Sequence, residues 1–237
     1  MPKAFWNLNL NATHSGIKAI SNVELQRAEA VRHVKLFLAP IDGHQYISDS
    51  MVPDYLISEG MVSRFLEIDP PLFRAMTEYD VIFNDIERSY VCGAFFSAVS
   101  ASVVTIERIL NVTRMELHPH VSPKIKELWG KGAIDKWQPN VEALVKWGYL
   151  SESLAQELTE LYGIRCNYLH SGSLASLPVD CKRTVLAAYN LSKEIIGFPP
   201  KLFTLKDGGI TCLNWEDPLV RIFYKRHLTV QEDSAAG

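Results

Sequence analysis

The residues best suited to chemistry lie together in one short segment, residues 165–170, with the sequence RCNYLH. Arg165 carries a permanent charge and presents forked donors that match the oxygen atoms of a phosphate group. His170 can exchange a proton near neutral pH, as a general acid or base does. Asn167 precedes His170 by three residues, so on a helix its amide can orient the imidazole ring. The segment therefore predicts a site that binds a phosphate group and moves a proton.

The spacing of Arg165 and His170 limits how one helix can use them. Five residues along an ideal helix leave the two side chains roughly 140° apart. Either the length of the arginine bridges that gap, or a second copy of the segment completes the site in a dimer. By spacing alone, such a pair is more often a surface or capping feature than a catalytic one.

Other polar stretches are weaker candidates. Glu107 follows an apolar run and could pair with Arg165 or position a substrate, although a charged helix end in solvent is the simpler interpretation. Lys124 and Lys126 belong to a basic stretch with interleaved tryptophans, which is typical either of an RNA-backbone contact or of a solvated face. Two histidines in a predicted connector, at 118 and 120, more often have no such role than bind a metal ion, so we predict no metal site there. A phosphate-binding glycine loop is also missing, and we expect no cofactor.

Composition and charge restrict the partners. The net charge of −3 gives no global attraction to nucleic acid, so any contact with RNA must come from a local patch. The four cysteines are scattered without paired spacing, which favours a reducing compartment. The N-terminal residues lack a secretion-signal pattern, and no uninterrupted apolar stretch appears long enough to span a membrane. We therefore expect a cytoplasmic protein that is not embedded in a membrane.

The elements that must position the segment are mainly helices. The apolar spacing predicts helices at 79–110, 141–147, 151–170 and 179–196, after a further helical stretch at 53–66. The first of the four is apolar around much of its circumference, as in a helix at the centre of a bundle. Ser151 is expected to cap the helix that carries Arg165, and Gly148 to end the one before it. We expect residues 111–123 to be a connector.

The two ends of the chain have a different texture. In residues 31–41, apolar and polar side chains partly alternate, which indicates a strand and turn. Residues 22–32 are equally compatible with a short helix. Residues 202–205 and 210–213 flank a glycine-containing turn and predict a β-hairpin. We therefore divide the chain into a mixed α/β N-terminal extension (1–75), a helical bundle (76–197) and a C-terminal β-hairpin with a tail (198–237).

The stretch 158–172, with the sequence LTELYGIRCNYLHSG, resembles the HEPN superfamily. Those domains are helical bundles whose hallmark is an arginine, four to six intervening residues and a histidine, often with a polar residue directly after the arginine. Four residues intervene here, but Cys166 stands where the family favours Asn, Asp or His. The resemblance covers roughly residues 79–196.

What the resemblance implies is a mainly α, HEPN-like bundle that acts on RNA as a metal-independent endonuclease and homodimer, in a defence or stress response. His170 would act as general base or acid at the ribose 2′-hydroxyl, and Arg165 would stabilise the charged transition state. Asn167 would orient the ring or hold the phosphate. Many members of the family are not catalytic. The alternative is therefore a module that binds nucleic acid, a nucleotide or a regulatory protein partner.

Overall fold

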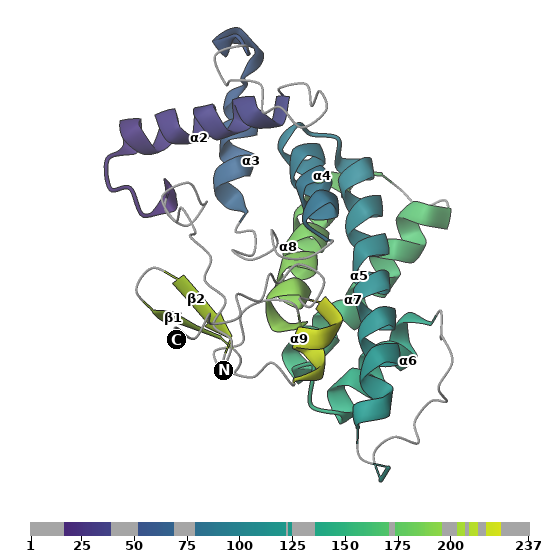
Figure 1. Ribbon diagram of the computed structural model, residues 1–237. Helices are drawn as coiled ribbons and strands as arrows, with labels where there is room; N and C mark the ends of the chain where they lie inside the picture. The colour runs from purple at the N-terminus through teal and green to yellow at the C-terminus, as the bar shows by residue number, and fades with distance from the viewer. Residues whose placement is uncertain are drawn as a thin grey trace, which may run out of the picture.

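The computed structural model describes residues 17–38, 52–68, 79–121, 123–124, 136–170, 174–195, 203–206, 209–212 and 217–223. Within them the chain is mainly helical, as predicted (Figure 1). The helices are α2 (Val23–Leu38), α3 (Glu59–Glu67), α4 (Asp80–Val91), α5 (Phe95–Leu117), α6 (Trp137–Lys146), α7 (Glu152–His170), α8 (Leu177–Ile195) and α9 (Pro218–Phe223), with 3-10 turns η3 (Asp54–Leu56) and η5 (His118–His120). The backbones of β1 (Phe203–Lys206) and β2 (Gly209–Cys212) pair antiparallel, with Phe203 opposite Cys212.

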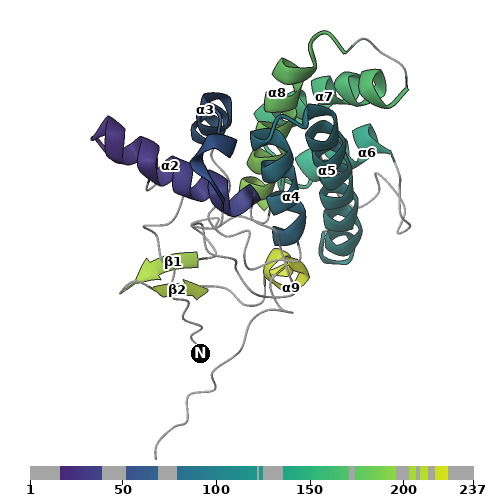
Figure 2. The same ribbon diagram turned by 90° about the horizontal axis from the view of Figure 1, so that it is seen from above.

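Helix α5 lies at the centre of the bundle (Figures 1 and 2). It packs against α4, α6, α7, α8 and α9. Its small and branched side chains let these neighbours approach closely, and Ala98, Val103, Ile106 and Ile109 are buried. The predicted core helix is therefore confirmed, although its bounds differ at both ends.

The single helix that we expected at 79–110 is wrong in one respect, because the chain forms two helices there. Helix α4 ends at Val91, and α5 begins only at Phe95. Between them, Gly93 has a φ of 82°, which glycine adopts far more readily than other residues. Arg64 of α3 donates from Nε to the carbonyl of Val91 at 2.9 Å and lies over the Phe95 ring at 5.6 Å. A side chain from another helix thus holds the break.

The C-terminal half of α5 lies where we expected a connector. The connector predicted at 111–123 is wrong as far as Leu117, because α5 continues to that residue and the 3-10 turn η5 follows. By length and composition alone, the Phe95–His120 stretch is long and apolar enough to cross a membrane, although polar residues interrupt it. A buried core helix passes the same test, and α4, α6 and α8 cover α5 here.

The described part of 1–75 is helical. The strand expected from residue 31 is wrong as far as Leu38, where α2 ends, and the helical alternative is confirmed. Asn22 starts this helix, since its Oδ1 accepts a hydrogen bond from the backbone N–H of Leu25 at 3.0 Å. Residues 39–41, the rest of that prediction, lie outside the residues that the structure describes.

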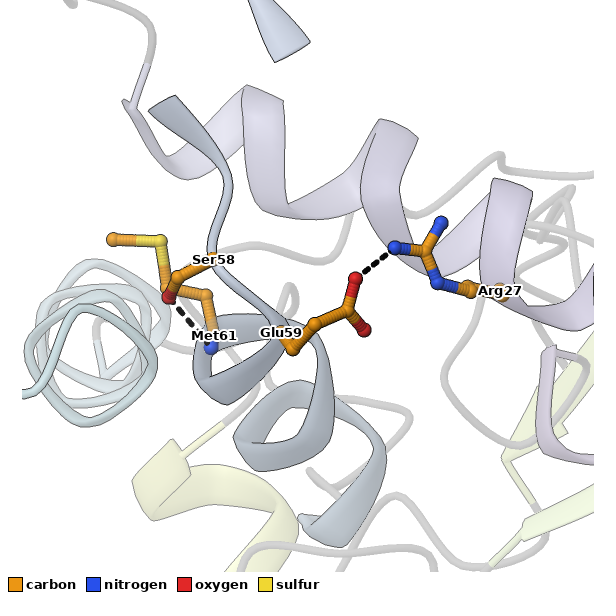
Figure 3. Close-up of polar contacts among 4 residues, drawn as sticks. All are labelled: Arg27, Ser58, Glu59 and Met61. Atoms are coloured by element: carbon orange, nitrogen blue, oxygen red, sulfur yellow. Dashed lines mark hydrogen bonds and ion pairs between the residues drawn. The ribbon is translucent and has the colours of Figure 1, made fainter. Parts of the chain in front are cut away.

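Helix α2 runs across α3 and contacts it through both polar and apolar groups (Figures 1 and 3). Ser58 caps α3 by accepting from the N–H of Met61 at 3.3 Å, and Glu59 of the first turn pairs with Arg27 of α2. Both partners of that ion pair are largely exposed, so it adds little stability. The stacking of His33 on the buried Phe65, with ring centroids 5.8 Å apart, is the apolar part of the contact.

The junction of α6 and α7 follows the predicted signals. Gly148, with a φ of 77°, ends α6, and the Oγ of Ser151 accepts from the N–H of Leu154 at 3.3 Å to cap α7. Helix α6 begins four residues earlier than expected, at Trp137. The indole N–H of Trp137 donates to the carbonyl of Leu158 at 2.9 Å, so α6 is tied directly to the helix that carries the candidate site.

Candidate functional site

Helix α7 carries the whole segment 165–170 and has one buried face. Side chains at intervals of three or four residues form that face: Leu154, Leu158, Leu161 and Tyr168 are all buried. Arg165 occupies the position in this series between Leu161 and Tyr168. A guanidinium therefore lies where the helical pattern places a core side chain, and burying it requires a charged or polar partner.

Glu107 of α5 is that partner. Nη2 of Arg165 donates to Oε2 of Glu107 at 3.1 Å and to Oε1 at 3.3 Å. The two side chains are 23% and 27% exposed, so water screens the pair only partly. The guanidinium carbon also lies 5.8 Å from the ring centroid of Tyr162, one turn earlier on α7.

The contact decides between the two interpretations of Glu107. Helix α5 continues for ten residues beyond it, to Leu117, so the charged helix end is wrong. The pairing with Arg165 is confirmed, across 58 residues of sequence. A role for Glu107 in positioning a substrate stays a prediction.

One donor of Arg165 is left over. Its Nε is buried and has no hydrogen-bond partner among the described residues. Leaving a buried donor of a charged group unpaired costs free energy, on the order of 1–3 kcal/mol. Because this Nε is buried, an anionic oxygen of a ligand reaches it only if a covering side chain moves; Nη2 can then stay on Glu107, since a guanidinium has five N–H groups.

The register of α7 places residue 170 away from Arg165. Gln156, Thr159 and Gly163 precede it by whole helical turns, and all three are exposed. Residue 170 ends α7 in register with these three positions, roughly 140° around an ideal helix from Arg165. The side chain of His170 lies outside the described part of the structure. Because the guanidinium is engaged with α5, bridging by the length of the arginine is the less favoured of the two arrangements.

The remaining candidates do not gather at this point. Asn167 is half-buried on the same turn of α7. Lys124 is exposed beyond η5, and about 15 Å of helix separates Glu107 from the end of α5, so the two belong to different places. Lys126 lies outside the residues that the structure describes.

The histidines of 118–120 have separate surroundings. His118 is buried with its ring edge-on to Trp147 at 5.9 Å, whereas His120 is exposed. Across the described ranges, no group of three or more His, Cys, Asp or Glu side chains is placed to hold a metal ion. The ring of His118 is therefore packed in the core, whereas His120 lies on the surface.

Tyr168 is a functional candidate that the sequence analysis missed. Its hydroxyl donates to Oδ2 of Asp180 at 2.5 Å and lies 3.0 Å from Oγ of Ser176. Burial of the ring, and next the hydrogen bond to Asp180, raise the pKa of Tyr168. A signal was present in the sequence, since a buried tyrosine hydroxyl needs a polar partner. Ser176 and Asp180, at the start of the next helix, are polar residues close to Tyr168 in the sequence.

Compared with protein-family models, curated proteins and solved structures, the chain shows no significant match in any of the three. The resemblance of residues 158–172 to the HEPN superfamily therefore stays a prediction.

Proposed function

We propose that this protein is a metal-independent RNA endonuclease with a HEPN-like bundle, which acts in the cytoplasm as a homodimer. The observation that carries the proposal is the arginine of the Arg-x4-His segment. Arg165 is held at 3.1 Å by Glu107 of the core helix, and its buried Nε lacks an acceptor in the part of the chain that the structure describes. Such a guanidinium is already oriented and has capacity for one more anionic oxygen.

The chemistry uses only groups of this chain and of the RNA. His170 takes the proton of a ribose 2′-hydroxyl, and the resulting oxygen attacks the adjacent phosphorus. The 5′-oxygen of the next nucleotide leaves and takes up the proton that His170 has accepted, so His170 ends neutral and the products are a 2′,3′-cyclic phosphate and a 5′-hydroxyl. Arg165 stabilises the extra negative charge on the phosphoryl oxygens as the new bond forms. Asn167 orients the imidazole or holds the phosphate.

The geometry of α7 supports the proposed dimer. Residue 170 lies roughly 140° around the helix from Arg165, which is turned toward α5. One copy therefore cannot easily aim both groups at one phosphate. A two-fold arrangement brings the arginine of one copy to the histidine of the other and forms the site twice.

A non-catalytic module is the second candidate, because the ion pair with Glu107 is also a sufficient structural reason for Arg165. In that case the protein binds RNA, a nucleotide or a regulatory partner and leaves the RNA intact. The two candidates differ only in whether His170 reacts.

The test is an RNA cleavage assay in the presence of a chelator, with wild type beside His170→Ala. The exposed His120 gives a matched control, His120→Ala. We expect wild type and His120→Ala to cut RNA to cyclic-phosphate ends, and His170→Ala to lose at least about 100-fold in rate, as expected for a general base. RNA left intact by the folded, dimeric wild type would favour the binding module. Equal cutting by His170→Ala would assign the activity to another site.

A further inference from the structure

We infer that Tyr168 and Asp180, joined with Ser176, form a clamp that fixes the last turn of α7, and that they are positioning residues for His170. The inference rests on the proposed function for its consequence in catalysis. Its structural part, that three side chains hold the helix end, can be tested without any activity.

The clamp consists of two hydroxyl groups on one carboxylate oxygen. Oδ2 of Asp180 accepts from the hydroxyl of Tyr168 at 2.5 Å and from that of Ser176 at 2.7 Å. Short O–H to carboxylate bonds of this kind are stronger than bonds between neutral groups. A tyrosine hydroxyl is protonated at neutral pH and so can donate, and the raised pKa of Tyr168 extends this to more alkaline pH.

The three residues join the end of one helix to the start of the next. Tyr168 is in the last turn of α7, and Asp180 is in the first turn of α8. Ser176 directly precedes α8, and its carbonyl accepts from the N–H groups of Val179 and Asp180, each at 3.0 Å. The clamp therefore fixes the last turn of α7 to a helix that packs on the core helix α5.

A helix end needs such support when a reactive group stands on it. The last carbonyls of a helix have no partner within it, and terminal turns open more readily than the interior. Residue 170 is the final residue of α7, two positions after Tyr168. A general base must keep its position to within about 0.5 Å, so a loose final turn would slow the reaction without changing how much RNA binds.

The rest of the α7–α8 interface does not depend on the clamp. Leu158 and Leu161 of α7, and Val185 and Tyr189 of α8, are buried in the common core. Arg183 of α8 also pairs with Glu160 of α7. Loss of the tyrosine hydroxyl should therefore leave the bundle folded and loosen only the helix end.

The structure offers a matched control for this change. The hydroxyl of Tyr90, in α4, donates to Oε2 of Glu67, in α3, at 3.2 Å. Tyr90 is also buried, so Tyr90→Phe removes the same kind of bond between α3 and α4 and leaves the ion pair of Glu67 with Lys182 of α8 in place. A general loss of stability would affect both variants, whereas a positional effect is confined to Tyr168→Phe.

The experiment measures amide hydrogen exchange of residues 166–170 and RNA cleavage kinetics for wild type, Tyr168→Phe and Tyr90→Phe. In Tyr168→Phe we expect exchange in this turn to rise about 10-fold and kcat to fall about 10-fold, with KM unchanged. Tyr90→Phe should leave both quantities at the wild-type level. Asp180→Ala should reproduce Tyr168→Phe, and Asp180→Asn, which keeps an acceptor oxygen, should restore most of the protection.

Any other result contradicts either the clamp, the positioning role or the proposed function. Unchanged exchange at 166–170 in Tyr168→Phe and Asp180→Ala shows that there is no clamp. Equal losses of kcat in Tyr168→Phe and Tyr90→Phe show a stability effect and not positioning. If exchange rises as expected but wild type leaves RNA uncut, the clamp exists, while the proposed function and the positioning role both fail.

Discussion

Among the described residues, two arginine–glutamate pairs join α7 to its neighbours, and they differ in how far they are exposed. Arg165 pairs with Glu107 of α5 with the side chains 23% and 27% exposed, on the buried face of α7. Glu160 pairs with Arg183 of α8 with the side chains 51% and 43% exposed. Exposed pairs contribute about 0–1 kcal/mol, so the second pair is an ordinary surface contact.

The difference in exposure indicates why a charged pair is present at Arg165 and Glu107. Bringing two charges partly out of water costs free energy that their attraction repays only in part, and apolar residues of similar size would stabilise such a position equally well. Arg165 also leaves its buried Nε without a partner among the residues that the structure describes. Stability alone is therefore a weak reason for a charged pair at this position, whereas binding an anion uses the charge, the orientation and the spare donor.

The largest expected difference between the two pairs is in activity. Arg165→Ala should slow RNA cleavage about 100- to 1000-fold, as removal of a group that stabilises transition-state charge does. Arg183→Ala should leave the rate within about two-fold, because its partner Glu160 lies on the exposed side of α7. The measurement is the single-turnover cleavage rate with saturating protein.

A second variant at Arg165 separates a loss of activity from a loss of folding. Arg165→Lys keeps a positive charge beside Glu107 but loses the forked donors. We expect it to fold as wild type by circular dichroism and still to cut RNA more than about 10-fold slower. Full activity in Arg165→Lys would show that a charge near Glu107 is all the site needs, and the role of the free Nε would fall.

The smaller expected difference is in stability. Glu107→Gln leaves a partly buried guanidinium without a charged partner, and should lower the free energy of unfolding by about 1–2 kcal/mol. Glu160→Gln, at the exposed pair, should lower it by less than about 0.5 kcal/mol. Urea denaturation of the two variants beside wild type measures both values. Equal losses would remove the distinction between the pairs.

Local signals in the sequence were sufficient for much of the fold around the site. Ser151 and Gly148 mark the junction of α6 and α7 because a cap and a left-handed glycine act on their immediate neighbours. The apolar series of α7 likewise fixes its buried face. Helices of this kind are predictable because the deciding contacts lie within one or two turns.

Features that depend on distant residues were not predictable in this way. The break at Gly93 looks like a tolerated helix glycine, and it is Arg64 of α3 that holds it. The choice of helix over strand for residues 31–38 is supported by Ala30 and Val34, which are buried one turn apart in α2. Partial alternation in the sequence carried no information about that packing.

At the candidate site, too, local sequence predicts some features and the packing of distant residues determines others. Arg165 and Glu107 were both candidates, but their pairing depends on how α5 packs on α7, across 58 residues. The bond from Tyr168 to Asp180 is closer in sequence, yet it crosses between two helices and required their arrangement. Residue types therefore predicted which groups matter, and packing determined which of them meet.

The central claim is that Arg165 of one copy and His170 of another act on the same phosphate, and mixed dimers test it most directly. Arg165→Ala and His170→Ala, each inactive alone, are refolded together in equal amounts with a chelator present. If the site forms between copies, half of the dimers carry one intact site, and about a quarter of wild-type cleavage should return. If the mixture exchanges subunits and stays as inactive as its parents, the two groups do not meet across a dimer and the account is contradicted.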